Sequence, residues 1–106
     1  MPQDFDFLAS AESLAVLANP TRFRIVFALL NGPVSAKRLA FLVQSTPKGV
    51  FYHLTLLQRA GVVSAAKIDK SVEYLLRGAW IDVDQGRRGF QIEIGAWRVT
   101  LLPVSR

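Results

Sequence analysis

The chain has 106 residues and a mass of 11.8 kDa, enough for one hydrophobic core and too little for two ordinary domains. Hydrophobic residues make up 51% of the sequence, which argues against a disordered chain. The absence of cysteine excludes disulfides, thiolate metal sites and cysteine nucleophiles. The single histidine, His53, cannot form a histidine-rich metal site alone, although a dimer could bring two copies together. We therefore expect no metal and no other cofactor.

Positive charge is concentrated in the middle of the chain. The net charge is +5, but the stretch from Thr21 to Val72 contains eight lysines and arginines against one acid, Asp69. The residues before Thr21 carry acids only, and the two signs nearly balance after Val72. A basic block flanked by acidic or neutral ends predicts a polyanionic partner such as nucleic acid. Basic faces without such a partner are also common, so charge alone leaves both interpretations open.

The sequence gives no indication of a membrane span or an export signal. The longest apolar run, around Ile25–Leu30, is about half as long as a membrane span. The acidic start, Met1–Asp4, lacks the basic region and the cleavage site of a secretory signal. We expect a cytoplasmic protein with no membrane partner.

Two helices are predicted before Pro33. Apolar residues at helical spacing predict the first over Asp6–Ala18. The second follows Pro20, with Thr21 near its start, and ends at the stop signal Asn31–Pro33. Its predicted inner face consists of Ile25, Ala28 and Leu29.

Two further helices are predicted between Ser35 and Gly61. Ser35 is a candidate N-cap for the third, and Gln44–Ser45 can end it. Thr46 is a candidate N-cap for the fourth, with Pro47 at the first helical position, where its missing N–H costs nothing. Gly61 suits the left-handed position just past the end of that helix. The predicted inward residues are Leu39, Ala40 and Val43 in the third helix and Val50, Leu54 and Leu57 in the fourth.

The rest of the chain is predicted to form strands. Val62–Ile68 and Ser71–Leu76 are rich in aliphatic residues and are separated by Asp69-Lys70, a pattern typical of a hairpin. Three later runs alternate like strands of a small antiparallel sheet: Trp80–Val83, Phe90–Ile94 and Trp97–Leu101. Turns between them are predicted at Gln85-Gly86, Gly89 and Gly95.

This order of elements predicts a mainly α, partly β (α+β) fold. Residues 1–76 are expected to form a winged helix-turn-helix with the hairpin as its wing. Residues 77–106 are expected to be a strand-rich extension packed on the same domain as an antiparallel β segment. In such a fold the fourth helix enters the major groove of B-DNA, and the wing reaches a phosphate or the neighbouring minor groove.

Two motifs within this region carry more specific information. Residues Leu17–Ile25 read LANPTRFRI, and Val50–Val63 read VFYHLTLLQRAGVV. They resemble the L-(G/A)-(D/N)-P-T-R-L-R-I and V-S-x-H-L-x-x-L-x-x-A-G-L-V motifs of the ArsR/SmtB family of bacterial and archaeal repressors. The resemblance covers about Ala11–Leu76. It implies a homodimeric winged-helix transcriptional regulator, usually a repressor, that reads an inverted repeat.

The chain also departs from that family. The cysteine-bearing metal motif of its arsenic and cadmium sensors is replaced by Val34–Leu39, VSAKRL, which contains no metal ligand. The usual C-terminal dimerisation helix is replaced by the strand-like tail. Metal sensing by the family's known routes is therefore unsupported, and the dimer interface is left to the first helix, the tail, or both.

The candidate DNA-binding residues come from the third helix, the fourth helix and the wing. They are Lys37, Arg38, Ser45, Thr46, Pro47, Lys48, Gly49, Phe51, Tyr52, Lys67 and Lys70. Lys48 is expected to reach a phosphate or a guanine, or else to be simply solvated. Phe51 either contacts a thymine methyl or packs on the wing. Tyr52 either hydrogen-bonds to DNA or caps the core.

Four other charged or titratable features have weaker interpretations. His53 matches a histidine of the family motif and is expected to be structural, bonded to backbone. Arg22 and Arg24 either contact phosphates or satisfy the preceding loop. Lys37 and Arg38 oppose the dipole of the third helix, which favours a phosphate contact. Arg87-Arg88 are either a second phosphate clamp or a solubilising loop.

Together these observations predict a sequence-specific regulator of transcription that binds double-stranded DNA, a dimeric repressor of the ArsR type without the known metal sites. The alternative is a winged-helix protein–protein module whose tail, with Trp80 and Trp97, binds a partner. An enzyme is not expected, because the sequence has no nucleophile–base pair, phosphate loop or clustered carboxylates. The sequence does not identify a small-molecule effector.

Overall fold

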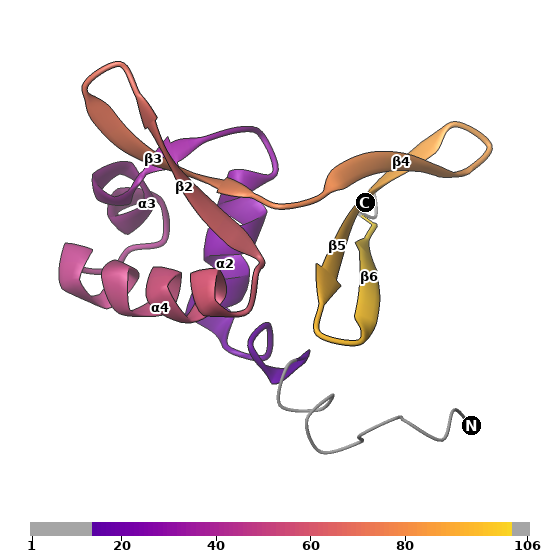
Figure 1. Ribbon diagram of the computed structural model, residues 1–106, viewed down its shortest axis with the longest axis horizontal. Coiled ribbons are helices and arrows are strands. Elements are labelled where there is room, and N and C mark those ends of the chain that lie inside the picture. The colour runs from indigo at the N-terminus through magenta and orange to yellow at the C-terminus, as the bar shows by residue number, and fades with distance from the viewer. Residues whose placement is uncertain (1–13, 103–106) are drawn as a thin grey trace.

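The computed structural model describes residues 14–102. Within that range, three helices and a small β-sheet form one body, and a second β-sheet stands beside it (Figure 1). This is the predicted α+β winged helix-turn-helix with an additional C-terminal antiparallel sheet.

Each helix begins where the sequence predicts it. The helices are α2 (Pro20–Leu29), α3 (Ala36–Leu42) and α4 (Pro47–Arg59). Their N-caps are Asn19, Ser35 and Thr46, and each side chain accepts a hydrogen bond from a backbone N–H of the first turn. Caps of this kind contribute about 1 kcal/mol each, because those amides have no partner within the helix. The helix predicted over Asp6–Ala18 lies largely outside the described residues.

The inward faces agree with the predicted spacing except in α2. Ile25 and Leu29 are buried as predicted, but Ala28 is only half-buried and Val26 is fully buried instead. The residues predicted to face inward from α3 and α4 are all buried. Gly61 has the predicted left-handed conformation, with φ of 78°.

The first sheet contains the wing. β2 (Val63–Ile68) and β3 (Ser71–Leu76) form the predicted antiparallel hairpin, in which Ile68 pairs with Ser71 across the turn. β1 (Val34–Ser35) pairs with the other side of β3, so the strand order is β1-β3-β2. β1 is not predicted from the sequence. This strand fixes the residues just before α3 to the base of the wing.

The second sheet is built from β4 (Ala79–Asp84), β5 (Arg87–Ile94) and β6 (Trp97–Leu101), in that order across the sheet. The predicted turns at Gln85-Gly86 and Gly95 are confirmed as the connections between its strands. The side chain of Trp80 packs edge-on against its cross-strand partner Phe90, with ring centroids 5.4 Å apart.

The prediction of a turn at Gly89 is wrong. Gly89 is buried inside β5, where it pairs with Ile81. A Cβ atom at this position would lie 2.6 Å from Cγ2 of Thr100 and 3.0 Å from Cγ2 of Val83. The glycine is therefore explained by the close approach of neighbouring side chains. Arg87 and Arg88 are likewise the first residues of this strand and not part of a turn loop.

The two sheets and the helices share a continuous cluster of buried hydrophobic residues. Ile25 of α2, Leu54 of α4 and Val62 at the start of the wing are almost completely buried. Phe90, Ile92 and Ile94 of β5 belong to the same cluster. Full burial of an aliphatic side chain of this size is worth about 1.5–3 kcal/mol, so β5 anchors the second sheet to the winged helix.

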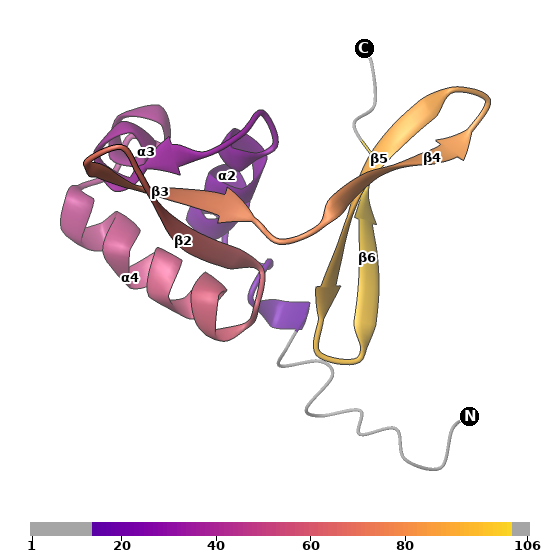
Figure 2. The same cartoon turned by 45° about the horizontal axis from the view of Figure 1, so that its top comes forward.

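The elements are distributed along the longest axis of the molecule. α3, the N-terminal end of α4 and the wing tip lie at one end, and the β4–β5 hairpin lies at the other (Figures 1 and 2). None of the helices within residues 14–102 is long and apolar enough to cross a membrane.

Candidate nucleic-acid interface

The turn between α3 and α4 sets the orientation of the fourth helix. Gln44 adopts a left-handed conformation, with φ of 54°, which reverses the chain after α3. The backbone N–H of Ser45 then donates to the carbonyl of Ala40 over 2.9 Å. The result is a compact helix-turn-helix in which the start of α4 follows directly from a fixed turn.

Three of the candidate residues, Ser45, Thr46 and Gly49, have a structural role in that turn. The Thr46 hydroxyl accepts from the backbone N–H of Gly49 over 3.1 Å. A Cβ atom at position 49 would lie only 2.9 Å from Oγ of Ser45 and 3.2 Å from Oγ1 of Thr46. Gly49 therefore leaves room for the cap, and these residues position α4 whether or not they contact a partner.

The side of α4 away from the core presents a cation and two aromatic rings. Lys48, Phe51 and Tyr52 are exposed, while Val50 and Leu54 between and beyond them are buried. Phe51 is 51% exposed and Tyr52 is 62% exposed. Tyr52 thus does not cap the core; its ring lies edge-on to that of His53, with centroids 5.2 Å apart.

The start of α3 adds two more cations. Lys37 and Arg38 are exposed in its first turn, where they oppose the helix dipole. The guanidinium of Arg38 lies over the exposed ring of Phe41, 5.5 Å from its centroid. The first turns of α2, α3 and α4 contain no acidic residue that would offset this positive charge.

The wing contributes Lys67 and Lys70, both exposed near its tip. Asp69 forms the tip between them in a left-handed conformation, with φ of 56°. Asp69 is also the only acid between Leu14 and Val72. The wing, α3 and the start of α4 lie at the same end of the molecule (Figure 1), and we call their exposed cations, Lys37, Arg38, Lys48, Lys67 and Lys70, the basic face.

Arg22 and His53 do not belong to that face. Nε of Arg22 donates to the carbonyl of Val16 over 2.7 Å, and its NH1 group lies 3.2 Å from Nδ1 of His53. Burial, followed by the nearby charge of Arg22, lowers the pKa of His53 from its ordinary value of 6.5. His53 is therefore structural as expected, but its partner is a side chain and not the backbone. Arg22 satisfies the preceding segment, one of its two predicted roles.

Comparison with known proteins identifies this architecture. The family model described as "Bacterial regulatory protein, arsR family" matches residues 19–65, from the cap of α2 into β2. The transcriptional regulator HlyU from Vibrio vulnificus is 31% identical; the match covers 66% of this chain and 74% of that protein, with a TM-score of 0.59. The chain belongs to the ArsR family of bacterial regulatory proteins. Its helix-turn-helix is accordingly that of a DNA-binding transcriptional regulator.

Other solved structures are similar to this ArsR-family chain. The transcriptional repressor BigR from Xylella fastidiosa is 25% identical over 68% of this chain and 71% of that one, with a TM-score of 0.62. A homodimeric winged helix-turn-helix domain from Mycobacterium bovis, 23% identical, covers 74% of this chain and 77% of that chain with a TM-score of 0.59, and shows the shared fold. No curated protein matches the chain in sequence.

The β4–β5 hairpin, whose second strand begins with Arg87 and Arg88, lies at the opposite end of the molecule from the basic face (Figure 1). The guanidinium of Arg88 lies over the ring of Trp80, 5.4 Å from its centroid. Arg88 also stands across from Asp82, and Arg87 across from Asp84, in the β4–β5 register. The ring of Trp80 is therefore a local partner of Arg88.

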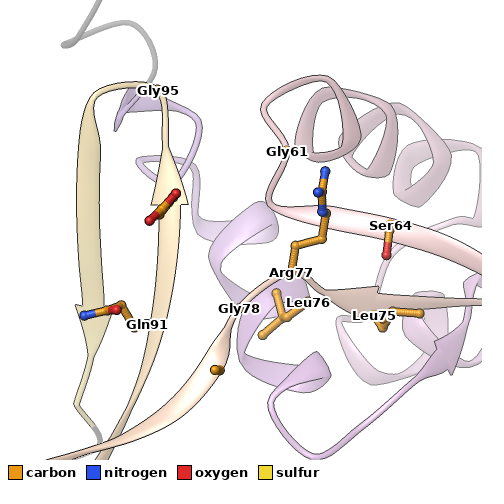
Figure 3. A pocket seen from close by; sticks show the side chains of 10 residues that line it. Gly61, Ser64, Leu75, Leu76, Arg77, Gly78, Gln91 and Gly95 are labelled. Atoms are coloured by element: carbon orange, nitrogen blue, oxygen red, sulfur yellow. The ribbon is translucent and has the colours of Figure 1, made fainter.

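An open gap of about 800 Å³ separates the wing sheet from the second sheet (Figure 3). Ser64 and Leu75 line it on the wing side, and Gln91 and Glu93 line it from β5. Arg77 is the basic residue of the lining, and its backbone N–H is fixed to the carbonyl of Val62 over 2.8 Å. Among residues 14–102, no group of three or more His, Cys, Asp or Glu side chains is placed to hold a metal ion.

One surface feature of the helices is not predicted from the sequence. Phe23 and Phe27 of α2 and Phe41 of α3 are exposed by 43%, 58% and 73%. The spacing of Phe23 and Phe27 places both on one face of α2, outside the stripe formed by Ile25, Val26 and Leu29. A helical projection of α2 could have revealed this second apolar face.

Proposed function

We propose that the protein is a sequence-specific repressor that works in the cytoplasm as a dimer and reads an inverted repeat in double-stranded DNA. The observation that carries the proposal is the basic face at one end of the molecule. It combines the exposed cations of α3, α4 and the wing with two acids of the wing, Asp69 at its tip and the half-buried Glu73 of β3. Phosphate contacts from such a face supply most of the affinity of DNA-binding proteins.

The members of this face would have different roles. Lys37, Arg38, Lys67 and Lys70 are suited to phosphates, because they are exposed and belong to elements that lie at the same end of the molecule as the start of α4. Lys48 at the start of α4 would reach a phosphate or a guanine, and Phe51 a thymine methyl group. Ser45, Thr46, Pro47 and Gly49 would hold α4 at the correct angle, and Tyr52 would contact the groove edge.

Repression and dimerisation are supported by the relatives. BigR is described as a repressor, and the M. bovis domain as homodimeric. Two recognition helices in a dimer would read half-sites about 34–36 Å apart. Val34–Leu39 supplies no ligand in place of the family's metal motif, so we do not expect this repressor to sense metals by that route.

Selection of bound sequences from a random duplex pool tests this proposal. The expected result is enrichment of an inverted repeat whose half-sites are about one helical turn apart. Lys70→Glu should weaken binding to all sequences, whereas Phe51→Ala should relax the preference at one base pair of each half-site. A chain that retains no duplex even at low salt would contradict DNA binding and favour the protein–protein module.

A further inference from the structure

An apolar groove lies at the junction of α2 and the second sheet. Its walls are Phe23, Val26, Phe27 and Leu30 of α2 together with Leu101 and Leu102 at the end of β6. The groove has a volume of about 90 Å³, and Phe27 beside it is 58% exposed. Exposed aromatic side chains beside a small apolar cavity are typical of the centre of a protein–protein contact.

The distribution of charge indicates which surfaces of two copies of this chain can approach each other. From Leu14 to Val72 the chain carries eight bases and one acid, whereas β4–β6 carries three of each. Two copies of this chain would repel each other through their basic faces, and DNA would occupy those faces. The second sheet has no net charge and carries both signs, so a second copy can meet it without repulsion.

The two edge strands of the second sheet, β4 and β6, differ in how well they can pair with a strand of another copy. The β4 edge is interrupted by an irregular register between Asp82 and Asp84, and charged or irregular edges resist pairing. The β6 edge is regular along its whole length, and its Arg98 is neutralised by Glu93 over 3.1 Å. β6 also ends at the groove, through Leu101.

We propose that a second copy of this chain docks by two-fold symmetry on the groove between α2 and β6 and on the adjoining β6 edge. A two-fold axis places the same strand of the two copies antiparallel, which is the direction in which β6 edges can pair. Phe27 of each copy would then lie at the groove of the other. This interface replaces a dimerisation helix with a sheet edge and leaves both basic faces free for DNA.

This inference deepens the proposed function, because a dimer is what an inverted repeat requires. Light scattering coupled to size-exclusion chromatography tests it on the full chain. The expected mass is twice 11.8 kDa for the unmodified protein and 11.8 kDa for Phe27→Glu. Circular dichroism checks that the variant is folded, and Phe27→Ser serves as the milder second variant if it is not.

Phe51→Glu is the matched control, since Phe51 is similarly exposed, by 51%, but lies on α4. This variant should keep the dimer mass while weakening DNA binding. A dimer that survives both Phe27 variants would overturn the inference, as would a dimer lost only when residues 1–13 are removed. An unmodified chain that is monomeric yet binds DNA would overturn this interface and leave DNA binding intact. A dimer that binds no DNA would contradict the proposed DNA binding and leave this interface intact.

The absence of cysteine allows a second, independent measurement. A single cysteine introduced as Thr100→Cys on β6 should give a covalent dimer with a short bis-maleimide. Lys70→Cys at the wing tip should not, because the wings point away from the axis. The opposite cross-linking pattern would place the two copies wing to wing and contradict the proposed contact.

Discussion

The guanidinium of Arg22 and the imidazole of His53 join α2 to α4 through a contact of 3.2 Å. A guanidinium has only donors, so Nδ1 of His53 must accept, which places the proton of the neutral ring on Nε2. The same guanidinium donates to the carbonyl of Val16. One arginine therefore ties together the segment before α2, α2 itself and the middle of the recognition helix.

Replacement of Arg22 should test this structural role. Arg22→Met should lower the free energy of unfolding by about 1–3 kcal/mol, because two charge-assisted hydrogen bonds are lost. Urea denaturation measures the effect. Arg24→Met is the matched control and should change stability by no more than about 0.5 kcal/mol, since Arg24 is exposed. If Arg22→Met left stability unchanged but weakened DNA binding, Arg22 would be a phosphate contact instead.

Stability should also depend on the protonation of His53. The folded-state pKa of His53 lies below the ordinary value of 6.5, so between these two values the unfolded chain binds more protons than the folded one. The contribution of neutral His53 is therefore present in full above pH 6.5 and is lost as the pH falls through the folded-state pKa. Urea denaturation at pH values across this window should show the decline. His53→Asn, which keeps an acceptor but does not titrate, should flatten it; an equal slope in both proteins would refute the assignment.

The cap of α4 gives a third prediction. Thr46→Ala should reduce stability by about 1 kcal/mol, because the N–H of Gly49 loses its acceptor. Thr46→Ser keeps the hydroxyl and should be close to neutral. Thermal unfolding compares the two variants. Equal losses in both would mean that the threonine methyl group, and not the hydroxyl, matters at this position.

Packing of the second sheet leads to a fourth prediction. Ile92 is 1% exposed and shares its buried cluster with α2 and α4. Ile92→Ala should cost about 2–5 kcal/mol and lower the midpoint of one unfolding transition common to helices and strands. Far-ultraviolet circular dichroism and tryptophan fluorescence, which reports on Trp80 and Trp97, should follow the same curve. Separate transitions would show that residues 77–106 fold as an independent unit.

Local signals explain how much of the fold the sequence predicts. The residues that start the helices act within one helical turn of their own position, so helix starts can be read directly from the sequence. They are the N-caps Asn19, Ser35 and Thr46, and Pro47 in the first turn of α4. The hairpin at Asp69-Lys70 is also local. β1 is only two residues long and exists because β3 offers a partner, which no local pattern signals. The prediction of a turn at Gly89 is wrong for a related reason, since the need for glycine there comes from Thr100 and Val83 on the neighbouring strands.

The candidate site is predicted less completely than the fold. The family motifs locate the recognition helix, and the exposed positions of Lys48, Phe51 and Tyr52 agree with that placement. Sequence spacing could not show that the guanidinium of Arg22 hydrogen-bonds to Val16 and His53, because His53 is distant in the sequence. The exposed face of Phe23 and Phe27 is not predicted from the sequence, because hydrophobic residues on a helix are normally assigned to the core.

The salt dependence of duplex DNA binding tests the central claim most directly. Fluorescence anisotropy should show that the logarithm of the association constant falls linearly with the logarithm of salt concentration, with a slope of about −0.9 for each phosphate contacted. Lys48→Ala and Lys70→Ala should each make that slope shallower by about one contact if both lysines reach phosphates. Arg87→Ala, at the opposite end of the molecule, should leave it unchanged. Binding that is independent of salt, or a slope altered by Arg87→Ala and not by the two lysine variants, would contradict the assignment of the basic face to DNA.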